Sequence, residues 1–223
     1  MKVKQSKIGN TFFHFGTAQE TVEDIQRNLQ LQSLIILDQT HGVNGHVITE
    51  NNCHMPFKSL EGDFLVTNQR NIGIAVLTAD CLPIIFIDKK NNAVGIAHAG
   101  WHGSVNNIIG ATLDCMHKNY GTTVFDVAVF LGPCAHVCCY KVGEDFLQHI
   151  KPFAFSGDAI VYRDNNLFFD LPHFNKHILL SVGLPQNSIH DEYSKCTICN
   201  EEYFSYRRQA DLAGRQVSVV SIK

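Results

Sequence analysis

Three residues suited to metal binding or nucleophilic chemistry each stand at the end of a short apolar run. His41 comes after the first run and before Gly42, Cys81 lies between the second and third, and His98 follows the fourth. Runs of this length, rich in Val and Ile and bounded by Asn, Gly or Pro, predict buried strands. Side chains that do chemistry are often presented where such strands end. The runs span 34–37, 72–79, 82–87 and 93–97.

A His, a Cys and a second His form the ligand set of a catalytic zinc, which keeps its fourth position open for water or substrate. Asp80 precedes Cys81 and is placed to orient a ligand or to move a proton. The separations of these ligands along the chain are no motif by themselves. The residues alone therefore leave two alternatives open: a buried thiol beside hydrogen-bonded histidines, and a Cys81 nucleophile that His98 activates.

The cysteine content raises a second possibility for metal binding. We expect a reducing compartment, where the eight cysteines are more often core thiols, metal ligands or catalytic groups than disulfides. Cys134-x3-Cys138 with Cys196-x2-Cys199 has nearly the spacing of a four-thiolate structural zinc site, which would leave Cys139 unused. The alternative is that these thiols pack beneath the main site.

Two features could bind a substrate that carries an anion and an aromatic ring. Arg207 and Arg208 follow Tyr206, and guanidinium groups match phosphate oxygens, although this cluster could equally be solvated surface. Trp101 could stack on a base or cap the core. The spacing of apolar residues predicts a helix from Ser104 to Gly121, whose first amides could face the same site as His98.

Strands and helices alternate without a strict βαβ rhythm, which predicts an α/β protein with mixed sheets. No linker or repeat divides residues 1–223, so we expect a single domain. The net charge of −3 argues against a nucleic-acid partner. The N-terminus lacks a signal-peptide core, and no apolar run approaches the roughly 20 residues of a membrane span, so we expect a cytoplasmic protein without a membrane partner.

Several motifs occur in order along the chain: DQTHGVNGHVI, GDFLVT, LTADCLPIIFID, GIAHAGWHG, LGPCAHVCCYKVG, CTIC and FSYRR. With these motifs the chain resembles the YfiH-like family of multicopper polyphenol oxidases (laccase domain) and purine nucleoside phosphorylases, which includes a human macrophage enzyme. The resemblance implies a layered α/β/β/α sandwich and a zinc ion on His41, Cys81 and His98. It also implies phosphorolysis of adenosine, inosine and methylthioadenosine, and deamination of adenosine, with a nucleoside and phosphate as the small-molecule partners.

Other relatives keep alternatives open. The chain is also similar to the catalytic domain of cytotoxic necrotising factors, where a Cys and a His form a nucleophile pair, and to peptidoglycan-precursor editing hydrolases. A non-catalytic metal-binding interaction module is a third reading. Copper is described for relatives, but the further ligands of a multicopper site could not be assembled from the sequence, so zinc is expected.

The chain departs from the family motifs at three places. His102 replaces the Arg of HAGWRG, Lys141 replaces the Glu of Tyr-Glu-Val, and an N-terminal Thr-Arg-x-Gly-Gly loop is missing. His102 is therefore a candidate for phosphate binding, together with Arg207 and Arg208, although two of the changes remove an arginine.

Overall fold

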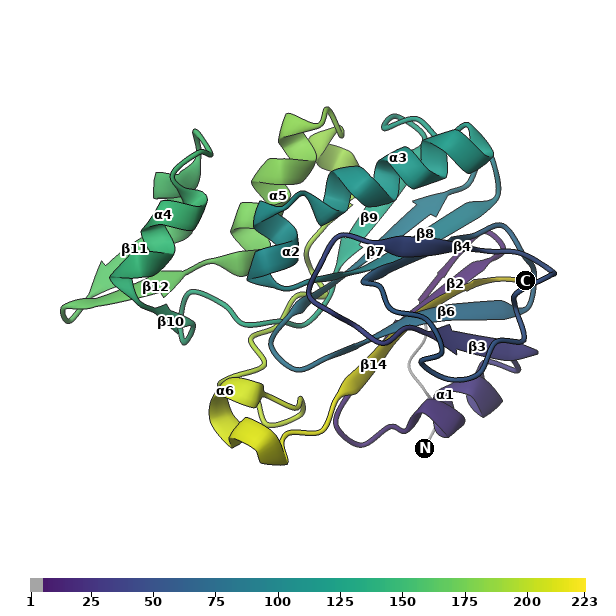
Figure 1. Cartoon of the computed structure of the whole chain (residues 1–223), viewed down its shortest axis with the longest axis horizontal. Coiled ribbons are helices and arrows are strands. Elements are labelled where there is room, and N and C mark those ends of the chain that lie inside the picture. The colour runs from purple at the N-terminus through teal and green to yellow at the C-terminus, as the bar shows by residue number, and fades with distance from the viewer. Residues whose placement is uncertain (1–5) are drawn as a thin grey trace.

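The computed structural model describes residues 6–223, which form two main sheets packed face to face (Figure 1). The first sheet has five strands in the order β1-β2-β14-β6-β3. The C-terminal strand β14 lies at its centre, antiparallel to both β2 and β6, whereas β3 pairs with β6 in parallel. The strands are β1 (Ser6–Ile8), β2 (Thr11–Phe15), β3 (Ser33–Ile36), β6 (Ile72–Thr78) and β14 (Gln216–Ile222).

The second sheet has six strands in the order β13-β9-β7-β8-β5-β4 and is also mixed, with parallel pairs at both edges. The predicted runs around Cys81 and His98 are confirmed as β6, β7 and β8. Because β6 and β7 belong to different sheets, the turn that carries Cys81 crosses from one sheet to the other. The strands are β4 (Gly45–Ile48), β5 (Phe64–Thr67), β7 (Leu82–Asp88), β8 (Ala93–Ala99), β9 (Val127–Leu131) and β13 (Ile189–His190).

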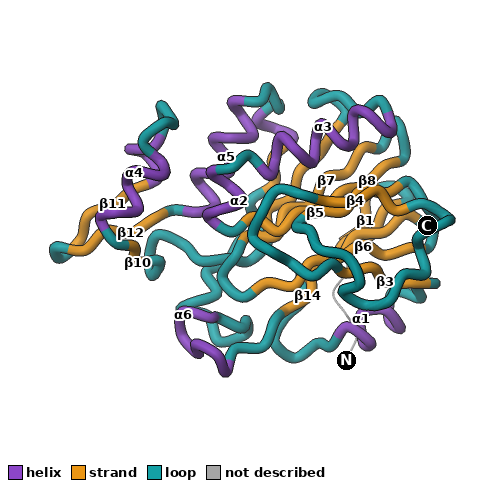
Figure 2. The backbone as a smooth tube through the Cα atoms, in the orientation of Figure 1, coloured by secondary structure: helices purple, strands orange, loops and turns teal. Residues whose placement is uncertain are grey.

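Three clusters of buried apolar residues hold the layers together. Figure 2 shows the strands lying between helices. Alternate residues of facing strands, such as Val76 and Ile85, fill the core between the sheets. Helix α1 (Val22–Asn28) places Ile25 and its neighbours on the outer face of the five-stranded sheet. Helices α3 (Ile108–Tyr120) and α5 (Leu171–Ser181) cover the six-stranded sheet. The expected α/β/β/α layering is confirmed.

The helix expected from Ser104 to Gly121 is in fact two helices. Helix α2 (Trp101–Val105) begins directly after Gly100, and α3 follows after a break. The break falls at Asn107, whose φ of 69° lies in the left-handed region and whose side chain caps α3. Asn tolerates this conformation and is a strong N-cap, so the local signal at Asn107 outweighed the continuous apolar spacing. The predicted end at Gly121 is confirmed.

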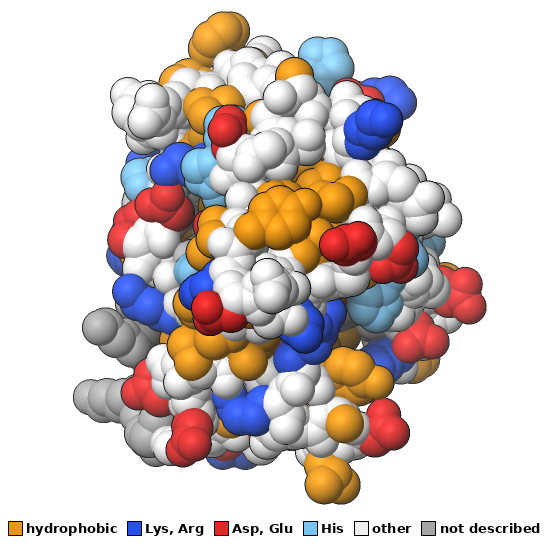
Figure 3. All heavy atoms as spheres, turned by 90° about the vertical axis from the view of Figure 1, so that its left-hand side faces the viewer, with side chains coloured by type: hydrophobic (Ala, Val, Ile, Leu, Met, Phe, Trp, Pro, Cys, Tyr) orange, Lys and Arg blue, Asp and Glu red, His pale blue; other side chains and the backbone are white. Residues whose placement is uncertain are grey.

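A third, small sheet projects from the sandwich and carries helix α4 (Leu147–Ile150), at the left of Figure 1. The strand β10 (Lys141–Val142) and a 3₁₀ turn (Glu144–Phe146) precede α4. Antiparallel strands β11 (Ile160–Arg163) and β12 (Asn166–Phe169) complete the sheet. On this end of the molecule, apolar side chains lie among charges of both signs (Figure 3).

The short helix α6 (Tyr206–Gln209) lies in the segment that leads into β14. No helix among residues 6–223 is long and apolar enough to cross a membrane.

Candidate active site and metal centre

The three predicted ligands meet at one end of the sandwich. His41 lies in the loop after β3, Cys81 in the turn between the two sheets, and His98 near the end of β8. One ligand atom of each lies within 4.8 Å of the others. The rings of His41 and His98 meet edge to face, with centroids 4.8 Å apart. Strands far apart in the sequence thus bring two imidazoles and one thiol together.

Asp63 organises this centre, and the sequence analysis gave it no role. Its fully buried carboxylate accepts a hydrogen bond from His98 Nδ1 at 2.8 Å. It also accepts the backbone N–H groups of His41 at 2.9 Å and Gly42 at 2.7 Å. The available signal in the sequence was an Asp directly before the apolar run 64–67, because a carboxylate at the start of a buried strand needs partners. Since an ionised carboxylate only accepts, His98 must donate from Nδ1, which leaves Nε2 free to bind a metal.

Backbone geometry makes room for the cluster. His41 has a φ of 61° and Asp80 a φ of 84°, both in the left-handed region. Such conformations cost energy and are concentrated at functional sites. At Gly100, a Cβ atom would lie 2.9 Å from Cys81 Sγ and 3.3 Å from a ring carbon of His41. Only glycine lets the backbone approach the two ligands this closely.

The observed residues fit a zinc ion. Zn–S bonds of about 2.3 Å and Zn–N bonds of about 2.0 Å place the three tetrahedral ligands roughly 3.3–3.5 Å apart, so small side-chain movements would close this cluster on a metal. The donor set, the hydrogen bond that orients His98 and the space that Gly100 leaves all agree with such a site. A cavity borders all three ligands, so a substrate in the cavity would reach a metal that they held.

The protonation states of the pair Cys81 and His98 are linked. Burial opposes ionisation of Cys81, but the charge of His98 and hydrogen bonds from both imidazoles lower the thiol pKa to about 6. Burial likewise opposes charging of His98, but Cys81 and Asp63 raise its pKa to about 9. In the metal-free protein at neutral pH, Cys81 is therefore a thiolate beside an imidazolium. The thiolate is the form that both zinc binding and nucleophilic attack require.

Asp80 lines the cavity, but its carboxylate is held by three donors. Oδ1 accepts the Thr197 hydroxyl at 2.6 Å, and Oδ2 accepts the Ser205 hydroxyl at 3.1 Å and the Arg207 backbone N–H at 2.7 Å. Asp80 thereby ties the turn of Cys81 to two C-terminal segments. Thr197 and Ser205, both fully buried, had no role in the sequence analysis.

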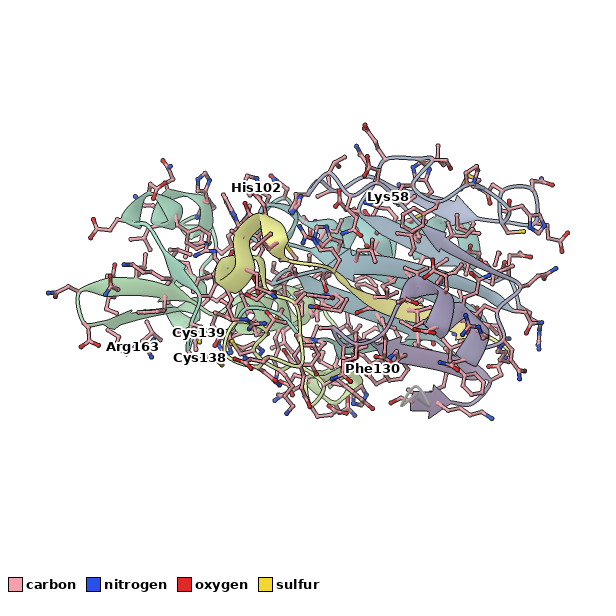
Figure 4. All side chains as sticks on the ribbon, turned by 90° about the horizontal axis from the view of Figure 1, so that it is seen from below. Lys58, His102, Phe130, Cys138, Cys139 and Arg163 are labelled. Carbon is pink, nitrogen blue, oxygen red and sulfur yellow. The ribbon has the colours of Figure 1, made fainter. Side chains whose placement is uncertain are left out.

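The cavity has a volume of about 650 Å³, within the range of small-molecule sites. Aromatic side chains and cations contribute to its wall. His102 on α2 packs its ring against Trp101, with centroids 3.6 Å apart. Burial and the neighbouring His41 and His149 lower the pKa of His102. In the view of Figure 4, His102 and Lys58 lie on the same side of α6. The aromatic and cationic residues of the wall are Lys58, Trp101, His102, Tyr140, Tyr206, Arg207 and Arg215.

The two neighbouring arginines are placed differently. Arg207 lines the cavity, where its guanidinium lies 4.6 Å from the Tyr140 ring centroid. Arg208 does not border the cavity. Its guanidinium donates instead to the backbone carbonyls of Thr197 at 2.7 Å, Ile198 at 2.7 Å and Tyr203 at 2.6 Å. The structure therefore brings every sequence-predicted site residue to the cavity except Arg208, which braces a loop.

A second group of possible ligands lies outside this cavity and corrects the four-thiolate set. Cys138, Cys139, Cys196 and Cys199 have their sulfur atoms within 4.8 Å of one another. Cys134 was expected in this set but is fully buried, with Ser194 Oγ 3.8 Å from its sulfur. Cys139, which was expected to be unused, takes its place.

Comparisons with known proteins identify the family to which the chain belongs. The model of a family described as multi-copper polyphenol oxidoreductase laccase matches residues 8–223. A purine nucleoside phosphorylase of Clostridium acetobutylicum is 32% identical over 163 residues, which cover 72% of this chain and 67% of the relative. A protein named adenosine deaminase, from an unknown prokaryotic organism, is 32% identical over 200 residues, which cover 86% of this chain and 76% of the relative.

A solved structure shows the same fold. The crystal structure of the Bacillus licheniformis hypothetical protein YfiH superimposes with a TM-score of 0.82 and 25% sequence identity. The match covers 96% of this chain and 93% of that protein.

Proposed function

Because the chain belongs to the multi-copper polyphenol oxidoreductase laccase family, whose relatives include proteins named purine nucleoside phosphorylase, we propose that it is a zinc-dependent purine nucleoside phosphorylase. The observation that carries the proposal is a His–Cys–His centre that opens into a cavity with aromatic and cationic walls. Aromatic rings suit a purine, and cations suit phosphate. The substrates would be adenosine, inosine or methylthioadenosine with inorganic phosphate.

The ligand set favours zinc over a multicopper cluster. Two imidazoles and a thiolate could also hold a single copper, but a multicopper oxidase needs further histidine-rich sites. Within residues 6–223, the only other group of three or more clustered ligands consists of cysteines. When bound to His41, Cys81 and His98, zinc supplies a Lewis acid and lowers the pKa of a bound water to about 7.

The residues of the cavity would then take distinct parts in phosphorolysis. A phosphate oxygen attacks C1′ of the ribose, and the bond from C1′ to the purine nitrogen breaks with its electron pair on the base. Arg207, His102, Lys58 and Arg215 would hold the phosphate, and Lys58 and Arg215 would offset the family arginines that this chain lacks. Trp101 would stack on the purine.

Tyr140 would donate a hydrogen bond to the departing base. Burial and the negative charge of Cys81 raise its pKa to about 12, so the phenol keeps its proton at neutral pH. Asp80 would act by orienting Cys81, because its own oxygens are already occupied by donors. Asp63 would fix His98 in the same manner.

Deamination of adenosine is a second activity that this centre could support, as the relative named adenosine deaminase suggests. The observation that favours a different class is the thiolate–imidazolium pair of Cys81 and His98. Such a pair is the activated form of a cysteine hydrolase acting on amides. A hydrolase of that kind would have no use for His41 as a ligand.

Product analysis tests the proposal. Purified protein is incubated with each nucleoside, with and without phosphate, and the products are identified by mass spectrometry. Phosphorolysis predicts release of free base only when phosphate is present, together with one ribose 1-phosphate per base. Conversion of adenosine to inosine in both conditions would identify a deaminase. The proposal fails if no nucleoside yields free base in a phosphate-dependent manner.

A further inference from the structure

The group formed by Cys138, Cys139, Cys196 and Cys199, here called the thiol cluster, lies apart from the residues that line the active-site cavity. Cys138 and Cys139 belong to the turn before β10, and Cys196 and Cys199 belong to the loop between β13 and α6. Figure 4 labels the first pair near the base of the projecting sheet, on the opposite side of α6 from His102 in that view.

Backbone hydrogen bonds bring the two turns together. Cys134 donates its N–H to the carbonyl of Lys195 at 3.0 Å, and Thr197 donates its N–H to the carbonyl of Cys134 at 2.9 Å. This bridge pairs the chain four residues before Cys138 with the residues on either side of Cys196. Asn200 donates to the carbonyl of Cys196 at 3.2 Å, which closes a tight turn between the third and fourth thiols. The cluster therefore rests on a paired backbone and not on chance contacts of mobile side chains.

We propose that the thiol cluster is a structural zinc site, separate from the active-site centre. Tetrahedral zinc with four Zn–S bonds of about 2.3 Å places its sulfur atoms about 3.8 Å apart. The sulfur atoms of Cys138 and Cys199 are already 3.9 Å apart.

The positive charges near the thiol cluster suit a zinc ion bound by four thiolates. Zinc binds the four sulfur atoms as thiolates and releases their protons to solvent, which leaves a centre with a net charge of −2. Arginines hold the turns from both sides. Arg163 donates to the carbonyl of Cys138 at 2.8 Å. Arg208 donates to the carbonyls of Thr197 and Ile198, between the third and fourth cysteines. Both guanidinium groups are permanent cations that offset the negative charge of such a centre.

The site has a consequence for the active-site cavity. Its first turn runs directly into Tyr140, which forms part of the cavity wall, and its second turn carries Thr197, which holds Asp80. A zinc ion at the thiol cluster would lock these two segments to each other. Its task would be to keep the wall of the cavity and the turn of Cys81 in position.

Metal analysis of the full chain tests the proposal. We expect about two zinc ions per wild-type chain and about one in the double variant Cys138→Ser/Cys199→Ser, because each three- or four-ligand site holds one ion. Cys115→Ser is the matched control, since Cys115 lies on α3 outside both groups, and it should keep both ions. His41→Ala/Cys81→Ser should lose the other ion. If the active-site assignment is wrong, the difference in zinc content between wild type and Cys138→Ser/Cys199→Ser still tests the thiol cluster.

Cobalt and a ligand-exchange variant complete the test. Cobalt-loaded His41→Ala/Cys81→Ser should show the intense sulfur-to-cobalt charge-transfer absorption of four thiolates. Cys199→His should keep the metal but weaken that absorption, because an imidazole replaces one thiolate. This result would show that Cys199 is a ligand even if the serine variants lose metal only because they unfold. Three results would overturn the proposal: equal zinc content in wild type and Cys138→Ser/Cys199→Ser, iron as the bound metal, or a disulfide among these cysteines in protein purified without reductant.

Discussion

The carboxylate of Asp63 accepts a hydrogen bond from His98 Nδ1 at 2.8 Å while its second oxygen accepts the backbone N–H of Gly42 at 2.7 Å. One buried side chain thus sets the tautomer of one candidate ligand and the loop conformation of another, His41. Burial opposes ionisation of Asp63, but His98, Gly42 and Thr40 lower its pKa to about 2. Asp63 therefore remains a carboxylate at any pH at which the protein would function.

Asp63→Asn should weaken zinc binding at the active site by about 10–100-fold, the usual effect of losing a carboxylate partner of a metal-bound His. The amide can still accept a hydrogen bond, but it supplies no charge. The measurement is competition with a chelator of known affinity in the Cys138→Ser/Cys199→Ser background, where only this site remains. Asp114→Asn, an exposed change on α3, is the control and should leave the affinity unaltered. Equal affinity in both variants would remove Asp63 from the metal centre.

Gly100→Ala should disturb the same centre through space alone. The added Cβ would lie 2.9 Å from Cys81 Sγ, so the thiol has to move or α2 has to shift. We expect weaker zinc binding and reduced turnover with little change in the folded far-UV circular dichroism. Gly157→Ala is the matched control, because a Cβ there meets no atom within 4 Å. An unchanged zinc affinity in Gly100→Ala would mean that the ligands do not need this space.

Labelling of Cys81 in metal-free protein should follow its lowered pKa. Because the thiolate is the reactive form, the rate of alkylation by iodoacetamide should rise with pH through about 6 and then stay level. Burial raises the pKa of Cys115, so the labelling rate of that thiol should still be rising with pH where the rate at Cys81 is already level. Mass spectrometry of the two peptides measures both rates in one sample. With zinc bound, Cys81 should be protected at every pH, and a Cys81 profile that rises only near pH 9 would refute the thiolate–imidazolium pair.

His102→Arg should restore a permanent cation to the cavity. The pKa of His102 is lowered by burial and by His41 and His149, so the side chain is neutral at pH 7 and becomes charged only as the pH falls below its ordinary value of 6.5. Hydrogen bonds to charged groups are worth about 1.5–3 kcal/mol, so the KM for phosphate should fall by at least about tenfold at pH 7. Wild type and variant meet the same ionic forms of phosphate at each pH, so the ratio of their KM values removes the effect of phosphate titration. This ratio should approach one at acidic pH, where His102 is charged. A ratio that does not change with pH would place His102 away from the anion.

Much of the site could be predicted because its ligands stand next to strong strand signals. The runs around Cys81 and His98 are long, β-branched and bounded by turn residues, so the ends of β6, β7 and β8 were predictable. The role of Asp63 was harder to predict, because it depends on a hydrogen bond to a residue 35 positions away. Single-sequence reasoning sees local periodicity, and it does not see which strand ends meet.

The remaining differences have local causes. The apolar pattern over 104–121 suits one continuous helix, but Asn107 adopts a left-handed conformation that interrupts it. Cys139 takes the place that was expected for Cys134 in the thiol cluster. The spacing of cysteines along the chain could not show this, because the side chain of Cys134 is buried at a backbone bridge to Cys196 that only the fold creates. Arg208 could not be told from Arg207 by type, since only the fold decides which neighbouring side chain turns toward the loop carbonyls.

The requirement for His41 tests the central claim most directly. Phosphate-dependent release of base is measured for wild type, for chelator-treated wild type reloaded with zinc, and for His41→Ala. If zinc on His41, Cys81 and His98 carries the reaction, chelation abolishes turnover and zinc restores it. His41→Ala should then lose more than about 100-fold of its activity, beyond the usual loss for an outer partner of a metal ligand. The account is contradicted if His41→Ala keeps full turnover while stoichiometric alkylation of Cys81 inactivates the metal-free protein.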